Sequence, residues 1–353
     1  MKKILHVISA LDNCGTERYL INLLKGTCFN FKNIIITYND SNYWKDELEK
    51  MGVKVYYVCD NSNFTRMKKI MKIIKKEDID IVYSYTFYNS AYVLLASFFS
   101  GVKNRITHSH RSSVDRKVNS LKIFACKLII SILSTHCLAC SEVAGKSLFL
   151  GFRRFKIINN CIDINQYNYN EKTRRMLRKK LKICDDTVVF GTIGRIDNNK
   201  NQKFLIDLFI QYHANNKNSK LIIIGDGVLR NELTNYVNSL NLTNDVLFLG
   251  NRNDANMYYN VFDLFFLTSY NEGLPFVLIE AQANGLSCIV SDCVTKNANI
   301  NGNVFFASLK DDIGVWLDII EKCVFIRKED ISKIIDLYSL DGMYKYIIDN
   351  IYK

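Results

Sequence analysis

Proline is almost absent from this chain. Pro275 is the one proline among 353 residues, and no low-complexity tail or internal repeat is present, so we expect an ordered globular protein. No apolar run reaches the ~18 residues of a membrane span, which predicts no transmembrane helix. The first ten residues are too short for a signal peptide and indicate a first strand.

Acidic residues are scarce in the first half. Residues 1–170 hold 25 Lys/Arg against 13 Asp/Glu, whereas residues 171–353 hold 22 of each. This asymmetry favours an anionic partner for the first half, either nucleic acid or a membrane surface. The alternative is a uniformly basic protein, which the neutral second half argues against. Nucleic acid is not expected, because its binding favours aromatic residues interleaved with a basic patch.

Cysteines are common but are not arranged as metal ligands. There are eleven, and the C-x-x-C pair of Cys137 and Cys140 has no second pair to complete a zinc site. Cysteines scattered through apolar segments are typical of reduced, cytosolic thiols. We therefore expect no bound metal and no cofactor.

Apolar strand-like runs alternate with helix-like segments, and the chain exceeds what one core usually holds. The runs fall at residues 4–10, 33–38, 53–59, 80–85, 104–108, 135–141, 156–159, 187–194, 220–225, 245–250, 263–269 and 286–291. This pattern predicts an α/β protein with two doubly wound parallel-sheet domains. We place them at 1–165 and 166–338, with a linker near 165–186 and the site in a central cleft at the strands' carboxyl ends.

The stretch around Pro275 organises the second domain. It predicts a helix that begins at the proline and ends at Gly285. Glu272 then lies in the loop before this helix, where backbone N–H groups suit an anion, and Glu280 lies inside it. Eight helical residues rise roughly 12 Å, whereas the two carboxylates of a hydrolase lie about 5–9.5 Å apart. The pair therefore suits two ends of one extended ligand.

Glu272 and Glu280, with Gly273, Leu274 and Pro275 between them, resemble the paired-glutamate signature of retaining glycosyltransferases of family 4, which have the GT-B fold. The alternative is a capped core helix with two exposed glutamates. The resemblance implies that Glu280 binds ribose hydroxyls, that Glu272 contacts the hydroxyls of the transferred sugar, and that the loop amides meet the diphosphate.

Other donor-side motifs follow in the family's order. Gly194-Arg195 and Lys200 resemble its diphosphate-binding segment, and two cations suit a group with at least two negative charges; the alternative is a solvated loop. Gly15 resembles a glycine that closes over the diphosphate, although Cys14 stands where another glycine is usual. Asn251 follows a strand that resembles the one contacting the base.

His108 and His110 end the fifth predicted strand, on one face. No third ligand is evident for a metal. The stretch resembles the family's histidine-serine-histidine motif, which implies that His110 faces the acceptor and the transferred sugar, with His108 in support.

The resemblance implies a retaining glycosyltransferase that moves a sugar from a nucleotide-sugar, expected to be UDP-linked, to a lipid-linked saccharide in capsular or exopolysaccharide biosynthesis. Glu272, Arg195, Lys200 and His110 are its expected catalytic residues, with no enzyme nucleophile. The alternatives are a non-hydrolysing UDP-sugar epimerase, which needs acid and base carboxylates in domain one, or an inactive sugar- or nucleic-acid-binding protein.

Two basic helices of domain one bear on localisation. Residues 66–76 form an apolar helical face bordered by lysines. This face could contact a membrane or pack on the sheet, and the sequence favours neither interpretation. Residues 120–130 are apolar enough that burial is expected. We expect a cytoplasmic protein, peripherally associated with the inner face of the cell membrane through domain one. A final helix at 339–353 is expected to pack on domain one.

Overall fold

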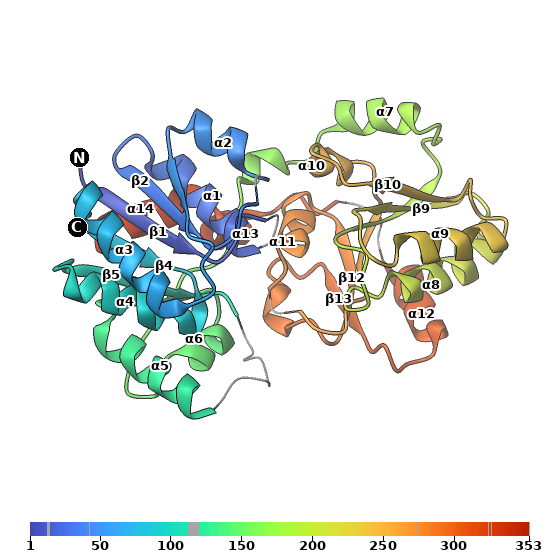
Figure 1. Cartoon of the computed structure of the whole chain (residues 1–353). Helices are drawn as coiled ribbons and strands as arrows, with labels where there is room; N and C mark the ends of the chain where they lie inside the picture. The colour runs from blue at the N-terminus through green and yellow to red at the C-terminus, as the bar shows by residue number, and fades with distance from the viewer. Residues whose placement is uncertain are drawn as a thin grey trace. The chain divides into compact units, whose positions relative to one another are not determined.

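The computed structural model describes residues 1–12, 15–41, 43–111, 120–272, 274–323, 325 and 327–352. The chain divides into two compact units (Figure 1). Unit 1 comprises Met1–Cys161 and Leu340–Lys353, and unit 2 comprises Ile162–Ser339. The sequence placed these boundaries after residues 165 and 338. No helix among the described residues is both long and apolar enough to span a bilayer.

Unit 1 is built on a seven-stranded parallel sheet with the order β3-β2-β1-β4-β5-β6-β7. Its strands are β1 (Lys3–Ile8), β2 (Lys32–Thr37), β3 (Lys54–Tyr57), β4 (Ile81–Ser84), β5 (Asn104–Ser109), β6 (His136–Ala139) and β7 (Lys156–Ile157). The order reverses between β1 and β4, and such a switch point leaves a crevice at the carboxyl ends of the strands.

The helices of unit 1 cover both faces of this sheet. They are α1 (Gly15–Thr27), α2 (Lys45–Lys50), α3 (Asn63–Glu77), α4 (Ser90–Phe99), α5 (Ser120–Leu133), α6 (Glu142–Leu148) and α14 (Leu340–Asn350). One buried cluster joins α1, α2 and α14 to the sheet through residues such as Leu20, Leu48 and Ile347. Two others join the opposite face to α3, α4, α5 and α6.

Unit 2 repeats this plan with six parallel strands in the order β10-β9-β8-β11-β12-β13. The strands are β8 (Val188–Ile193), β9 (Ser219–Ile224), β10 (Val246–Gly250), β11 (Leu264–Leu267), β12 (Ser287–Ser291) and β13 (Val304–Ala307). The order reverses between β8 and β11. Each strand predicted from the sequence is present, and β13 was not predicted.

The helices of unit 2 form two layers. They are α7 (Glu171–Lys180), α8 (Gln202–Asn215), α9 (Arg230–Ser239), α10 (Ala255–Tyr258), α11 (Phe276–Ala283), α12 (Ile313–Lys322) and α13 (Ser332–Tyr338). One cluster packs α7, α10, α11 and α13 on the sheet. The other packs α8, α9 and α12 on the opposite face, around the fully buried Trp316.

Two sequence expectations were wrong. The predicted linker at 165–186 contains helix α7, and Arg178 of this helix is 1% exposed and bonded to Asp263 at 2.6 Å. Because Asp263 is distant in sequence, the charged residues of this segment were interpreted as a solvent-exposed linker. Residues 120–130 were expected to be buried, but α5 buries only Cys126, Ile130 and Ser131. Ile129 and Leu133 are partly buried against the same cluster, whereas Leu121, Phe124, Leu128 and Ile132 lie at the surface because one narrow stripe suffices to pack a helix.

Candidate functional site

The switch point of unit 2 brings two loops together. The loop after β8 spans residues 194–201, and the loop after β11 spans residues 268–275. Tyr270 donates its backbone N–H to the carbonyl of Asn199 at 2.8 Å, and Thr268 Oγ1 donates to the carbonyl of Asn201 at 3.0 Å. These bonds hold the loops side by side, so side chains distant in sequence share one site.

Lys200 and Glu272 meet across these loops as an ion pair between Nζ and Oε1. Their side chains are 20% and 15% exposed, so the pair is only partly open to solvent. The backbone N–H of Lys200 also donates to Asp197 Oδ1 at 3.0 Å, which fixes the start of the turn. Two predicted site residues are therefore adjacent, with a cation and an anion available at the carboxyl edge of the sheet.

Arg195 lies in the same loop but points elsewhere. Its side chain is 72% exposed, and its Nε bonds Asp197 Oδ2 at 2.8 Å. Gln202 holds its backbone by donating to the Arg195 carbonyl at 2.9 Å. The structure thus fixes the Arg195 backbone at the site and leaves its guanidinium in solvent.

The glycine loop after β9 packs directly on the loop that follows β8. A Cβ at Gly225 would lie 2.0 Å from the carbonyl oxygen of Gly194, and one at Gly227 would lie 2.2 Å from that of Ile196. Only glycine permits such close backbone approach. Asn251 is exposed directly after β10, at the same edge of the sheet.

Helix α11 starts at Phe276, with Pro275 as its N-cap, one residue later than predicted. Glu280 is 3% exposed within this helix. Its Oε1 accepts from Tyr167 at 3.0 Å and its Oε2 accepts from Tyr259 at 2.6 Å. A buried carboxylate here is thus bonded to hydroxyl groups.

Leu274 packs against the core cluster that contains α11. Gly273, a predicted donor contact, lies outside the described residues. Gly15 is the first residue of α1 in unit 1, and Cys14 beside it is likewise outside the described residues.

Two of the histidines of unit 1, His108 and His110, lie together at the end of β5. The rings of His108 and His110 are 4.1 Å apart, and Tyr83 Oη bonds His108 Nδ1 at 2.9 Å. Tyr19 extends this chain with a 3.2 Å bond to the Tyr83 hydroxyl. Burial lowers the pKa of His110 to about 3 and that of His108 well below its usual value. Both imidazoles are therefore uncharged at neutral pH.

Glu17 matches the glutamate of the family's glycine-glycine-x-glutamate loop, but no separate role was predicted for it from the sequence. It lies in the first turn of α1 and is 8% exposed. Burial raises the pKa of its carboxyl to about 7, which is typical of groups at functional sites. A sequence signal exists, because Glu17 shares one helical face with Leu20, Ile21 and Leu24, all of which are buried.

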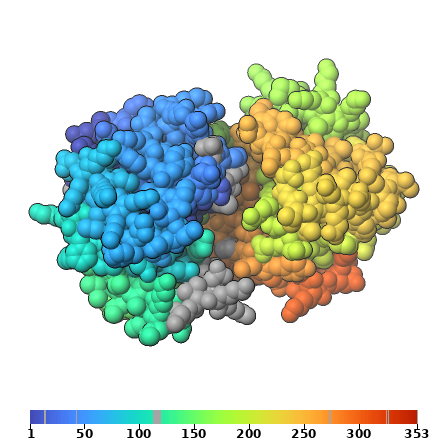
Figure 2. Space-filling view, in the orientation of Figure 1, coloured from blue at the N-terminus to red at the C-terminus, as the bar shows by residue number. Residues whose placement is uncertain are grey.

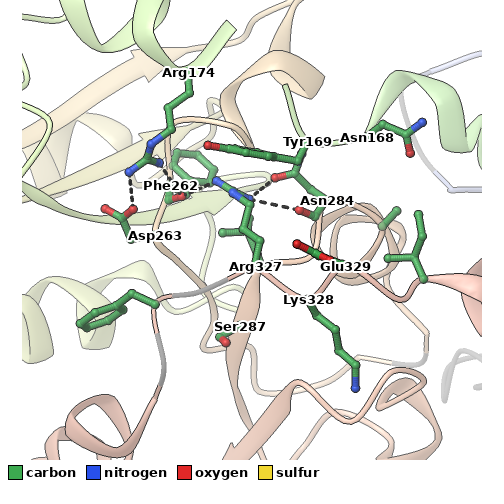
Figure 3. Close-up of a pocket in the computed structure, with 14 residues that line it drawn as sticks. Asn168, Tyr169, Arg174, Phe262, Asp263, Asn284, Ser287, Arg327, Lys328 and Glu329 are labelled. Carbon is green, nitrogen blue, oxygen red and sulfur yellow. Dashed lines mark hydrogen bonds and ion pairs between the residues drawn. The ribbon is translucent and has the colours of Figure 1, made fainter. Parts of the chain in front are cut away.

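A cavity of about 420 Å³ in unit 2 lies beside the amino ends of β11 and β12, away from the loops just described (Figure 3). Its arginines are engaged by the protein: Arg174 bonds Asp263 at 2.6 Å, and Arg327 donates to the carbonyls of Phe262 and Asn284 at 2.8 and 3.2 Å. We therefore assign this cavity a structural role. Among the described residues, no cluster of three or more His, Cys, Asp or Glu is placed to hold a metal ion.

Comparisons with known proteins identify the family of this chain. Residues 173–311 match the family described as "Glycosyl transferases group 1". The "Capsular polysaccharide biosynthesis glycosyltransferase CapH" of Staphylococcus aureus is 30% identical over 94% of this chain and 93% of its own. The "UDP-Gal:alpha-D-GlcNAc-diphosphoundecaprenol alpha-1,3-galactosyltransferase" of Escherichia coli is 30% identical over 71% and 68%.

Among solved structures, that of Anabaena Alr3699/HepE in complex with UDP superposes with a TM-score of 0.82, covering 100% of both chains at 19% identity. This likeness establishes the GT-B fold, with its two Rossmann-like domains. Together with the 30% identity to the staphylococcal protein over nearly all of both chains, it leads to the conclusion that this chain belongs to the group 1 glycosyltransferases.

Proposed function

We propose that this glycosyltransferase moves a sugar, with retention of configuration, from a UDP-sugar to a lipid-linked saccharide in capsular or exopolysaccharide biosynthesis. The Lys200–Glu272 pair at the switch point of unit 2 carries the proposal. The E. coli relative's name states a UDP-linked donor and a diphosphoundecaprenol-linked acceptor. The S. aureus relative's name states capsular polysaccharide biosynthesis.

Departure of UDP is the step that these residues assist. As the glycosidic bond breaks, negative charge grows on the diphosphate and positive charge on the sugar ring. The Lys200 ammonium neutralises the leaving group, with Arg195 turning inward from solvent and the N-terminus of α11 adding backbone N–H groups. These protein groups meet the charge without a bound metal.

The two glutamates bind neutral parts of the donor. Glu272 accepts hydrogen bonds from hydroxyls of the transferred sugar, while its ion pair with Lys200 holds it in place. Glu280 accepts from the ribose hydroxyls. The bonds from Tyr167 and Tyr259 hold this carboxylate in place at 3.0 and 2.6 Å.

His110 faces the acceptor and the transferred sugar, with His108 in support. Because both imidazoles are uncharged at neutral pH, they bind hydroxyl groups and add no charge to the site. The bond from Tyr83 to His108 Nδ1 fixes the orientation of that ring.

Membrane contact is assigned to the outer face of α5 in a cytoplasmic protein. Leu121, Phe124, Leu128 and Ile132 are 75%, 54%, 37% and 63% exposed, and their spacing places them on one side of the helix. Lys122 is exposed beside them, and the α5 segment lies at the surface in the space-filling view, in green (Figure 2). Apolar side chains with basic neighbours suit an anionic bilayer surface.

Helix α3, at residues 63–77, adds charge to the same face of the unit 1 sheet. It packs its apolar face inward, with Ile70, Ile73 and Ile74 buried, and leaves Lys68 and Lys72 exposed. Its contribution is therefore electrostatic, whereas α5 supplies the apolar contact.

Vesicle co-sedimentation tests this surface. We expect the full chain to bind vesicles that contain anionic lipid and to dissociate by about 0.5 M salt, where screening is strong. The double variant Phe124→Glu, Ile132→Glu should bind weakly, and Val315→Glu, at a similarly exposed site of unit 2, should bind normally. Equal binding to neutral vesicles, or normal binding by the double variant, would contradict the assignment.

Nucleotide binding and transfer test the function itself. UDP should raise the melting temperature more than GDP or TMP does, because a ligand that binds only the folded state stabilises it. Incubation with UDP-sugars and a lipid-linked saccharide should then yield a product with the donor's anomeric configuration by NMR. Isomerisation of the UDP-sugar without an acceptor would indicate an epimerase instead.

A further inference from the structure

A second, smaller cavity lies entirely within unit 1, at the switch point between β1 and β4. Its volume is about 80 Å³, and because one water needs ~10–15 Å³ by this measure, it has space for several water-sized groups. A polar substituent of a sugar fits such a space. The lining combines hydroxyl, amide and acidic groups with aromatic walls: Ile8, Ser9, Thr16, Glu17, Tyr85, Thr86, Phe87, Tyr88, Asn89, His110 and Arg111.

Buried polar atoms without partners line this cavity. Glu17 Oε2 is inaccessible to solvent and has no hydrogen-bond partner among the described residues. Both ring nitrogens of His110 are also inaccessible to solvent and outside well-aligned hydrogen bonds, although a hydrogen-bonding interaction with the Asn160 side chain raises its pKa against the larger effect of burial. Buried polar groups are normally bonded, and exceptions require an explanation such as a missing ligand.

The backbone at the cavity is strained. Phe87 lines it with φ of 54°, a left-handed conformation that is an outlier for a bulky residue. Its side chain is 6% exposed and packs with Ala91 and Leu94, which holds the strained turn. Such strain persists where surrounding structure enforces it and clusters at ligand sites.

The charges around Glu17 favour an uncharged ligand. Burial is the main cause that raises the pKa of its carboxyl to about 7; Asp12 raises it further, whereas its own backbone N–H and Arg111 lower it. The titratable groups that line the cavity beside Glu17 are the neutral imidazole of His110, the phenols of Tyr85 and Tyr88, and the solvent-exposed guanidinium of Arg111. A neutral carboxylic acid both donates and accepts hydrogen bonds, which matches a hydroxyl or an amide.

We propose that this cavity binds one uncharged substituent of the acceptor saccharide, a hydroxyl, hydroxymethyl or acetamido group, through Glu17 and His110, and that Glu17 determines acceptor specificity. This inference rests on the proposed function, since it names the part of the acceptor that unit 1 recognises. Glu17 takes part in no bond rearrangement. Its contribution is to select among sugars whose substituents differ at one carbon.

Binding of simple glycosides tests the proposal without the natural acceptor. The probes are the methyl glycosides of glucose, galactose, N-acetylglucosamine and N-acetylgalactosamine, each titrated into the full chain with saturating UDP and followed by saturation-transfer NMR. We expect one or two of the four to bind at pH 6. Glu17→Ala should weaken that binding by about tenfold, the value of one or two hydrogen bonds to a buried group.

Glu142→Gln is the matched control, because Glu142 also lies in the first turn of a unit 1 helix but is solvent-exposed. It should bind the glycoside as the wild-type chain does. Unchanged binding in Glu17→Ala, or binding of none of the four glycosides by the wild-type chain, would overturn the proposal.

The pH dependence separates a ligand-binding role from a structural one. A bound substituent covers Glu17 and disfavours its ionised form further, so affinity should be full at pH 6 and fall as pH rises through about 7. Glu17→Gln, which cannot ionise, should bind the glycoside with no such fall. A parallel pH profile in this variant would show that Glu17 does not contact the ligand.

UDP distinguishes failure of this inference from failure of the proposed function. If UDP stabilises the chain and no glycoside binds, the cavity assignment is wrong and the donor site stands. If UDP does not stabilise the chain, the proposed function itself is wrong.

Discussion

The two units have the same plan but place opposite chemistry at the same point. In both, a parallel sheet reverses its strand order, between β1 and β4 or between β8 and β11. Unit 2 presents an ion pair of Lys200 and Glu272 there. Unit 1 presents two uncharged imidazoles and Glu17, whose carboxyl is about half ionised at pH 7 because burial raises its pKa to about 7. The fold therefore fixes where a ligand contacts the sheet, and a few loop residues decide which of the two substrates is bound there.

The net charge of each half of the chain does not predict the charge of its site. Residues 1–170 carry the positive excess, yet Arg111 is the one cation among the described residues that line the cavity of unit 1, because the lysines lie on the outer faces of helices such as α3. The second half is balanced overall and still concentrates a cation at its site. The net charge of a domain thus indicates which surfaces it binds, whereas the charge of its site depends on individual residues.

The largest effect is expected for Lys200, in the charged site of unit 2. Lys200→Ala should reduce turnover by on the order of 10²-fold or more, because the leaving diphosphate loses its nearest cation. The melting temperature should change little, and glycoside binding by unit 1 should persist. Steady-state kinetics provide the measurement.

Lys203→Ala is the control for that variant. Lys203 lies three residues further on, is 53% exposed and pairs with Asp207, so its loss should leave turnover near the wild-type value. Equal turnover in the two variants would remove Lys200 from the site.

A smaller effect is expected on the neutral side. Tyr83→Phe removes the hydroxyl that bonds His108 Nδ1 and should raise the KM for acceptor roughly two- to tenfold, the value of one hydrogen bond. The KM for donor should not change. Tyr56→Phe, which removes a hydroxyl bonded to Glu77 in the same unit, should leave both constants unaltered. A change confined to the donor KM would contradict the assignment of the histidines.

Removal of metal ions is expected to have no effect on activity. Activity should persist in excess EDTA, because protein cations and helix amides neutralise the diphosphate. Complete loss of activity that Mn²⁺ or Mg²⁺ restores would show that the charged site of unit 2 is incomplete without a metal.

Much of this architecture was predictable because buried parallel strands are continuous apolar runs. The run at 263–269 became β11, and the proline after it marked the start of α11. Strand β13 was missed because Val304–Ala307 is short and is preceded by polar residues. Helix α7 was missed because the charge of its residues predicted solvent exposure.

The site was predictable where residues follow strands directly and less so where tertiary contacts decide. Lys200 and Glu272 follow β8 and β11, so their meeting follows from the topology. The exposure of Arg195 depends on its bond to Asp197, and the role of Glu17 depends on the helix face that carries it inward. The first cannot be predicted from spacing, whereas the burial of Glu17 could have been predicted from its place on the same helical face as Leu20, Ile21 and Leu24.

The return of α14 to unit 1 has a consequence for biosynthesis. Met343, Ile347 and Ile351 complete the same core as Leu20 and Leu24, so unit 1 lacks part of its core until the residues that follow unit 2 have been added. Unit 2 has its whole sequence within Ile162–Ser339, so its own folding does not require the residues after 339. A chain stopped at residue 339 should therefore contain a protease-resistant unit 2 attached to a unit 1 that proteases readily cleave.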